Sequence, residues 1–240
     1  MSGPGTPPGG QALPESAVDA LAHCMRTLRS VRRFLAADVD QRSVEFVLEL
    51  ATRAGSAKNR QPWRFVVVRD ARVLAELTGW YRRSWQKMAD LAASRPELYP
   101  AGGRRQAQLR ESEFLARSFG SVPVVVVACF IPSPSNPADF YGGASVYPAV
   151  QNLLLAARAI GLGGTLTTLQ AVDELPEAAC LEGGGGVVAE LRELLGIPAE
   201  VVPAAVVPLG WPAEPLTANR RTPVREVSSV DRWDSRWSTG

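Results

Sequence analysis

The chain has 240 residues, 46% of them hydrophobic, which is enough to bury the core of a single α/β or α+β domain. Its 26 basic and 24 acidic residues leave a net charge of +2, so it lacks the excess of positive charge that is typical of nucleic-acid-binding proteins. Three scattered cysteines without metal-ligand spacing indicate neither a disulfide framework nor a zinc site, and they favour a reducing cytoplasm.

The opening residues 1–14 are rich in glycine and proline and predict a disordered tail ahead of a folded domain at 15–240. They lack the basic segment followed by an apolar segment that is typical of a signal peptide. The longest apolar run, 122–131, is too short to cross a bilayer. We therefore expect a protein that is neither exported nor inserted in a membrane.

Two amphipathic helices are the first predicted elements, with Ser16 expected to cap the first and Asp40 the second. Their apolar faces repeat at helical spacing: Val18, Leu21, Ala22 and Met25 in the first, and Val44, Val47, Leu48 and Ala51 in the second. The polar segment 55–63, punctuated by glycine and proline, predicts a loop that leads into a strand at 65–68.

The second half of the chain predicts alternating strands and helices. Runs of apolar residues at 122–130 and 204–209 indicate strands, and the first of these is expected to be buried on both faces. Between them we expect a long buried helix with Pro148 in its first turn and Gly161 at its end, then β-favouring residues at 163–168. A short helix from Val188 should stop at Gly196.

Residues 80–119 are predicted to form a helical insertion. The segment combines Trp80, Tyr81, Trp85 and Tyr99 with Arg82, Arg83, Arg104 and Arg105. Such a mixture is poorly suited to a core but suits a flat, anionic or electron-poor ligand. We expect the insertion to cover an active site, and the alternative is a helical arm that stabilises a dimer.

Three polar segments could carry chemistry, although each also has an ordinary explanation. At 29–34 a serine and arginines could bind a phosphate, or could be a solvated basic run after a helix. The loop with Ser56, Asn59 and Gln61 could present amide and hydroxyl groups to a heterocycle, or could be a plain turn. The segment 219–223 could contribute further arginines, or could be a charged tail.

Taken together, four segments resemble the nitroreductase family from about Thr27 to Val227. They are RSVRRF at 29–34, SAKNRQPWRFVVV at 56–68, QNLLLAARAIGLG at 151–163 and RRTP at 220–223. The resemblance implies an α+β domain whose central, mostly antiparallel sheet is flanked by helices. It also implies an intertwined homodimer with FMN at the subunit interface and NAD(P)H as electron donor.

The same resemblance implies the residues that bind the cofactor. Arg29 and Ser30 would face the FMN phosphate, and Arg32 would face the ribityl chain and pyrimidine edge, where it would stabilise the reduced flavin. Other residues would complete the site: Gly55, Ser56, Ala57 and Asn59 from the partner subunit, Leu166, Thr167 and Thr168 along the ring, Ser145, and Arg220 or Arg221 at the phosphate. Leu28 and Gly55 depart from the family's usual arginine and proline.

No side chain stands out as a catalytic acid, base or nucleophile, and His23, the only histidine, is expected on the polar side of a helix. This fits flavin chemistry, in which the cofactor itself carries the hydride. The resemblance implies a ping-pong oxidoreductase that passes a hydride from NAD(P)H through FMN to a nitroaromatic, quinone or similar acceptor. Two alternatives stay open: other flavin chemistry on this fold, such as reductive dehalogenation, dehydrogenation of a natural-product intermediate or flavin breakdown, and a non-catalytic flavin-binding protein.

Overall fold

The structure, a computed structural model, describes residues 12–100, 102–133, 140–174, 186–233, 235 and 237. Most of the predicted tail, residues 1–11, therefore lies outside the described residues. The chain divides into a large unit, Arg29–Leu216, and a terminal unit that combines Met1–Leu28 with Thr217–Gly240. Each unit has its own internal contacts.

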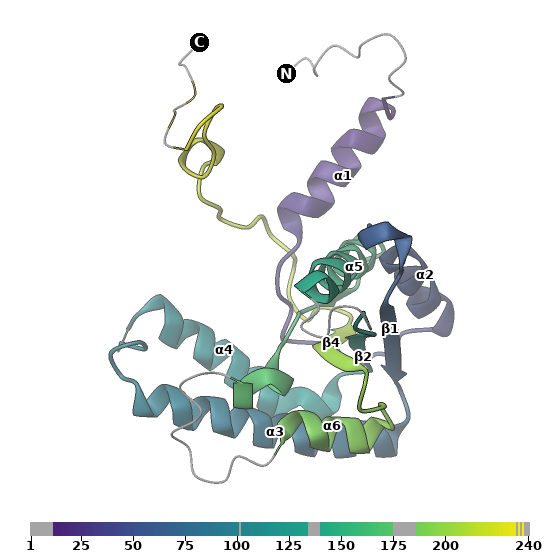
Figure 1. The fold of residues 1–240 in the computed structure, drawn as a ribbon, viewed down its shortest axis with the longest axis vertical. Helices are drawn as coiled ribbons and strands as arrows, with labels where there is room; N and C mark the ends of the chain where they lie inside the picture. Colours follow the sequence, from purple (N-terminus) through teal and green to yellow (C-terminus); the bar gives the residue numbers. More distant parts are fainter. Residues whose placement is uncertain are drawn as a thin grey trace. The chain divides into compact units, whose positions relative to one another are not determined.

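A four-stranded antiparallel sheet forms the centre of the large unit, in the order β1-β2-β4-β3 (Figure 1). Its strands are β1 (Trp63–Val68), β2 (Val124–Phe130), β3 (Gly163–Gly164) and β4 (Val202–Gly210). All three strand pairs are antiparallel. The expected α+β class and antiparallel sheet are confirmed.

The central strand β2 is covered by helices on both faces, as its unbroken apolar run predicts. The side chains of Val125, Val127 and Cys129 belong to a buried cluster with residues of α3 (Ala71–Ser94) and α6 (Val187–Leu195). The alternate residues Val124, Val126 and Ala128 are completely buried as well. Successive strand residues point to opposite faces, so both faces of β2 lie in apolar surroundings.

Helices α2 (Gln41–Ala51) and α5 (Phe140–Ala159) lie on one side of the sheet, and α3 and α6 lie on the other (Figure 1). The helix α4 (Arg104–Ser118) packs beside α3 and contributes Leu115 and Ala116 to the same buried cluster. The large unit thus has a helix–sheet–helix arrangement.

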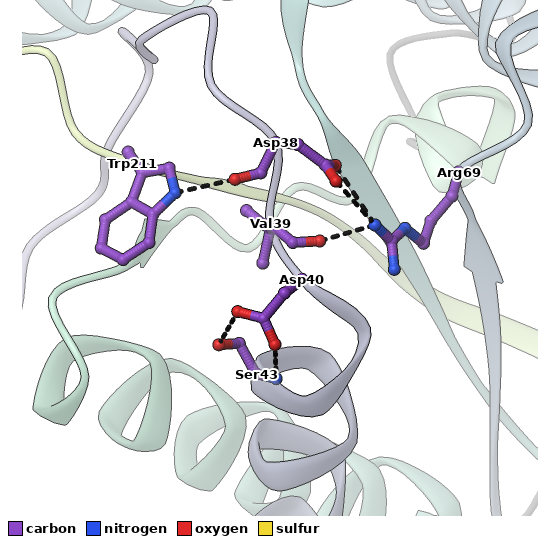
Figure 2. Close-up of polar contacts among 6 residues, drawn as sticks. All are labelled: Asp38, Val39, Asp40, Ser43, Arg69 and Trp211. Carbon is purple, nitrogen blue, oxygen red and sulfur yellow. Dashed lines mark hydrogen bonds and ion pairs between the residues drawn. The ribbon is translucent and has the colours of Figure 1, made fainter.

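Two predicted helix ends are confirmed by their hydrogen bonds. The Asp40 carboxylate accepts from the Ser43 backbone N–H at 2.9 Å and from the Ser43 hydroxyl at 2.7 Å (Figure 2). These bonds, the hydroxyl bond first, hold the pKa of Asp40 below its usual value. At the C-terminal end of α6, Gly196 adopts a left-handed conformation with φ of 64° and ends the helix.

The expected positions of Ser16 and Pro148 are wrong. In the terminal unit, α1 (Glu15–Thr27) follows Pro14 and has no side-chain cap, so Ser16 lies inside the helix. The helix α5 already begins at Phe140, so Pro148 lies in its interior. A Cβ atom at Gly142 would come within 2.1 Å of the Phe130 ring, so this glycine lets α5 pass close to β2.

Part of the 80–119 segment is core, contrary to the expectation from its composition. Trp80, Tyr81 and Phe119 are completely buried or nearly so, and the rings of Tyr81 and Phe119 are stacked with centroids 4.0 Å apart. The Trp80 indole N–H donates to the Val187 carbonyl at 2.8 Å, which satisfies its buried polar group. The aromatic residues of this segment are therefore divided between the core and the surface, and Tyr81 also borders the cavity described below.

The terminal unit joins α1 to the C-terminal segment. The Asn219 backbone N–H donates to the Arg26 carbonyl at 3.0 Å, and its side-chain amide donates to the Leu28 carbonyl. Large apolar side chains of this unit stay exposed: Val18, Leu21, Met25, Val224, Val227 and Trp233. The apolar face of α1 is therefore not covered within the described chain.

Candidate active site

The segment Arg29–Phe34 lies along the short edge strand of the sheet. The Val31 N–H donates to the Gly164 carbonyl at 3.0 Å, and the Ala213 N–H donates to the Arg33 carbonyl at 3.0 Å. These bonds fix the backbone in an extended path between β3 and the residues after β4. Alternate side chains of this segment consequently point in fixed and opposite directions.

A second set of contacts fixes the chain just after this segment (Figure 2). The indole N–H of Trp211 donates to the Asp38 carbonyl at 3.0 Å. The Arg69 guanidinium, at the end of β1, donates to the Val39 carbonyl at 2.6 Å and to the Asp38 carboxylate at 3.2 Å. Together these bonds attach residues 38 and 39 to the residues that directly follow β4 and β1, and so fix the chain just after the basic segment.

A cavity of about 350 Å³ lies between α3, α4 and the residues that follow β3. Its walls include Arg32, Tyr81, Trp85, Leu166, Thr167 and Thr168. Helix α4 and the turn before it add Tyr99, Arg105, Gln108 and Leu109. The cavity therefore combines aromatic and aliphatic walls with a small number of polar groups, as ligand-binding pockets generally do.

A smaller cavity of about 170 Å³ adjoins it, since Arg32 lines both. Its walls include Arg29, Ser30, Arg33 and two carboxylates, Glu111 and Glu214. Hydroxyl and guanidinium groups in one concave site are suited to binding a phosphate.

The two carboxylates of the smaller cavity are both paired with Arg33. The guanidinium lies 3.3 Å from Glu111 and 3.4 Å from Glu214, and its carbon atom lies 4.0 Å from the centre of the Phe114 ring. Arg33 thus links the basic segment to α4 and offsets one of the two negative charges there. The positive charge that faces the cavity comes from Arg29 and Arg32.

The Tyr81 hydroxyl is the most perturbed polar group of the larger cavity. Burial raises its pKa to about 12, although a hydrogen bond with Thr167 and the charge of Arg32 act in the opposite direction. The Thr167 hydroxyl in turn donates to the Val206 carbonyl at 2.8 Å. Tyr81 is therefore a neutral hydrogen-bonding group, and it ties the residues after β3 to α3.

The structure brings together one part of the predicted cofactor site. Arg29, Ser30 and Arg32 line the smaller cavity, and Arg32 lines the larger one with the segment Leu166–Thr168. Ser145 is buried in α5 and lines neither of these two cavities. Arg220 and Arg221 belong to the terminal unit, so their role at the phosphate stays a prediction.

The predicted loop of Gly55, Ser56, Ala57 and Asn59 also lines neither cavity. It contains a 3-10 turn with left-handed backbone at Asn59 (φ 55°) and at Gln61 (φ 50°). The Gln61 N–H donates to the Ser56 hydroxyl at 3.0 Å, and the Gln61 amide donates to Asn59 at 3.1 Å. The loop is therefore a preformed, strained turn with polar side chains rather than a flexible connection.

Sequence reasoning did not assign several cavity residues. Tyr81 and Trp85 were placed only in a general cover, and Gln108, Leu109 and Glu214 were not singled out. The sequence offered one usable signal for Trp85: a large aromatic residue on an otherwise polar helical stretch. Glu214 carried none, because its pairing with Arg33 depends on the path of the chain after β4.

Among the residues that the structure describes, no group of three or more histidine, cysteine, aspartate or glutamate side chains could hold a metal ion. No helix in the same residues is long and apolar enough to cross a membrane.

Comparison with known proteins identifies the class of enzyme. The Nitroreductase family matches residues 25–211, which is most of the chain and includes the basic segment, the sheet and both cavities except for the residues after 211. The chain belongs to the nitroreductase family, and as a member of it is an FMN-dependent oxidoreductase.

Individual relatives are similar along most of their length. A Methanothermobacter thermautotrophicus protein named for NADH dehydrogenase or NAD(P)H nitroreductase activity is 28% identical over 83% of this chain and 80% of its own. An iodotyrosine deiodinase of Thermotoga neapolitana is 28% identical over 78% of this chain and 86% of its own. A nitroreductase with bound FMN from Desulfitobacterium hafniense has the same fold, with a TM-score of 0.63, 18% identity and coverage of 88% and 98%.

Proposed function

We propose that the protein is a homodimeric reductase that uses NAD(P)H to reduce nitroaromatics, quinones or similar electron-poor compounds. The observation that carries this proposal is the position of Arg32. It lines both a basic cavity suited to a phosphate and an adjoining aromatic cavity suited to a flat ring. A single cofactor with a phosphate at one end and a ring at the other would fit this arrangement.

The described residues fit FMN on the side of the phosphate. Arg29 and Ser30 would hold the phosphate group in the smaller cavity, because a guanidinium and a hydroxyl both donate to its oxygens. The cavity is lined by more guanidinium groups than carboxylates, and Arg33 lies between Glu111 and Glu214, so the lining still favours an anion. Arg220 or Arg221 is proposed to supply a further cation.

Arg32 and the segment Leu166–Thr168 would act on the flavin ring. When bound, FMN would take a hydride from NAD(P)H and then deliver it to the acceptor, a ping-pong scheme with both substrates using one cavity. The fixed charge of Arg32 would favour the reduced, anionic cofactor over the oxidised one. The backbone N–H and the side-chain hydroxyl of Thr167 both donate to the Val206 carbonyl, so the backbone N–H groups of Leu166 and Thr168 are the donors proposed for the ring.

The remaining cavity residues support binding rather than proton transfer. Burial raises the pKa of Tyr81 to about 12, so its hydroxyl is protonated near neutral pH and cannot serve as a base there. Trp85 and Tyr99 offer flat apolar surface for an aromatic acceptor. Protons for the reduced product would come from solvent.

Two features support a homodimer with FMN at the interface. The terminal unit leaves Val18, Leu21 and Met25 exposed along one face of α1, an arrangement suited to a subunit contact. The preformed loop Ser56–Asn59 lines neither cavity of its own subunit, which fits a loop that reaches the cofactor of the partner.

Cys24 and Cys129 are free thiols, in agreement with the proposed cytoplasmic location.

Reductive dehalogenation is the second candidate, favoured by the similarity to the Thermotoga neapolitana iodotyrosine deiodinase. It would use the same cofactor site and differ only in the acceptor.

Purification and anaerobic reduction test the proposal. We expect a yellow dimer with one FMN per chain whose flavin absorbance is bleached by NADH or NADPH within seconds and restored by a nitroaromatic or quinone. A colourless monomer that does not take up FMN would contradict the cofactor site and the dimer. Bleaching that only a halogenated phenol reverses would favour dehalogenation, and flavin that NAD(P)H never bleaches would favour simple binding.

A further inference from the structure

The larger cavity carries positive charge only. Arg32 and Arg105 are its two charged lining residues, and none of its lining residues is an aspartate or glutamate. Arg32 is assigned to the cofactor in the proposed function. Arg105 therefore remains as a charge that faces the space left for a substrate.

Other arginines of the same region are engaged elsewhere. Arg82 donates to the backbone carbonyls of Ala116 at 3.3 Å and Arg117 at 2.8 Å, which ties α3 to α4. Arg83 pairs with Glu190 of α6 at 3.0 Å. Neither lines the larger cavity, and the side chain of Arg104 is not among those that the structure describes.

Arg105 is held at the cavity wall by a single backbone contact. Its guanidinium donates to the Leu98 carbonyl at 3.2 Å, and no ion pair involves it among the described residues. A guanidinium has five N–H donors in one plane, so most of them stay available to a ligand. The partners that match this fork best are carboxylate, sulfonate and phosphate groups.

We propose that Arg105 binds an anionic group of the electron acceptor, so that the preferred acceptors are aromatic anions such as nitrobenzoates or quinone sulfonates. This inference rests on the proposed function, because it takes the larger cavity as the acceptor site. Trp85 and Tyr99 line the same cavity and supply the surface for the ring, while Arg105 supplies the charge. The combination selects a flat molecule with one negative substituent over its neutral analogue.

The expected preference is modest because Arg105 is exposed to solvent. Exposed ion pairs are screened, so replacing Arg105 should change acceptor selectivity by roughly five-fold rather than by orders of magnitude. For the same reason the preference should shrink as the salt concentration rises from about 0.05 to 0.5 M.

The test compares 4-nitrobenzoate with its neutral analogue 4-nitrobenzamide, using the FMN-loaded wild type, Arg105→Gln and Arg105→Lys. Arg110→Gln is the matched control, since Arg110 is exposed on the same helix and does not line the cavity. Stopped-flow mixing of the prereduced enzyme with each acceptor gives the ratio of the two second-order rate constants. The intrinsic difference in reactivity between the two compounds cancels when variants are compared.

We expect Arg105→Gln to lower the benzoate-to-benzamide ratio roughly five-fold, Arg105→Lys to keep part of it, and Arg110→Gln to leave it unchanged. Titration calorimetry with benzoate and benzamide, which the enzyme does not reduce, should give the same loss of preference in Kd. An unchanged ratio in Arg105→Gln would overturn the proposal. So would a variant that is slow only in flavin reduction by NADPH, because Arg105 would then serve the phosphates of the donor.

The same experiment separates this inference from the proposed function. If the wild type binds FMN, is reduced by NAD(P)H and reduces both acceptors without a dependence on Arg105, only the inference fails. If the wild type binds no FMN or is not reduced, the proposed function fails first.

Discussion

The Tyr81 and Thr167 side chains face each other at the wall of the larger cavity, where α3 lies against the residues that follow β3. Thr167 continues the connection to β4 through its bond to the Val206 carbonyl. The cavity wall is thus continuous with the core of the sheet, so the residues proposed to lie along the flavin do not depend on a free loop.

The buried Tyr81 makes stability depend on pH in the alkaline range. Its pKa rises from 10.0 in the unfolded chain to about 12 in the folded protein, chiefly through burial. The unfolded chain therefore releases the proton first, so the stability that Tyr81 contributes is complete below pH 10 and is lost as the pH rises toward 12. The loss should approach about 1.4 kcal/mol per pH unit.

Urea unfolding of wild type and Tyr81→Phe at pH 8, 10 and 11.5 checks this expectation. At pH 8 the variant should be less stable by about 1 kcal/mol, because one hydrogen bond is lost. That deficit should shrink or reverse at pH 11.5. Thr167→Val is the control: it removes the partner but keeps Tyr81 buried, so the alkaline loss should persist. A deficit that stays constant across this pH range would contradict the assigned cause.

The contacts of Arg69 with residues 38 and 39 should contribute unequally. The bond to the Val39 carbonyl is short, at 2.6 Å, and partly buried, whereas the Asp38 carboxylate is largely exposed. We expect Arg69→Met to lower the free energy of unfolding by about 1 to 2 kcal/mol, because a partly buried carbonyl loses its charged donor. Asp38→Asn should cost less than about 0.5 kcal/mol. Equal effects of the two substitutions in chemical denaturation would show that the ion pair, and not the backbone contact, is what matters.

Most of the fold could be predicted from sequence because its signals are local. The spacing of Val44, Val47 and Ala51, the capping carboxylate of Asp40 and the left-handed Gly196 each lie within a few residues of the structure that they specify. Pro148 was misplaced because the close approach of Gly142 to Phe130, which joins residues of a helix and a strand, cannot be seen in local sequence.

The sequence marks only those residues of the candidate cavities that lie in a family motif. Arg29, Ser30 and Arg32 were found by resemblance and share a cavity in the structure. The composition of residues 80–119 does not distinguish the residues that enter the core from those that face the cavity. Tyr81 and Trp85 are four residues apart on one helix, yet Tyr81 is buried against Phe119 and Trp85 is only partly buried.

Arg32 and Arg29 should affect different steps of the reaction. Because Arg32 lines both cavities, Arg32→Ala is expected to weaken FMN binding and also to slow flavin reduction by NAD(P)H. Losing such a donor costs about 2.7 to 4 kcal/mol in other enzymes. Arg29→Ala, which alters the smaller cavity alone, should weaken FMN binding and leave the reduction rate of the loaded enzyme near wild type. Stopped-flow reduction at saturating FMN measures the difference, and unchanged kinetics in loaded Arg32→Ala would refute its electrostatic role.

Trp85 is expected to set acceptor preference, because its side chain is partly buried and lines the larger cavity without belonging to the fully buried core. Removing the indole in Trp85→Ala takes away flat surface that a large quinone would contact more extensively than a small nitrobenzene. We expect kcat/KM for the quinone to fall several-fold more than kcat/KM for the nitrobenzene. FMN content, dimerisation and flavin reduction by NAD(P)H should stay near wild type.

Trp80→Phe is the matched control for a structural effect. Trp80 lies five residues earlier on α3, is completely buried and donates to the Val187 carbonyl at 2.8 Å. Its replacement removes that buried hydrogen bond and shrinks a completely buried side chain, so it should lower the free energy of unfolding by about 1 to 3 kcal/mol while the ratio of the two acceptors stays constant. If Trp85→Ala instead behaves like this control, losing flavin or dissociating at lower denaturant with the acceptor ratio unchanged, then Trp85 belongs to a structural arm. In that case, acceptor preference must be set by the α4 side of the cavity.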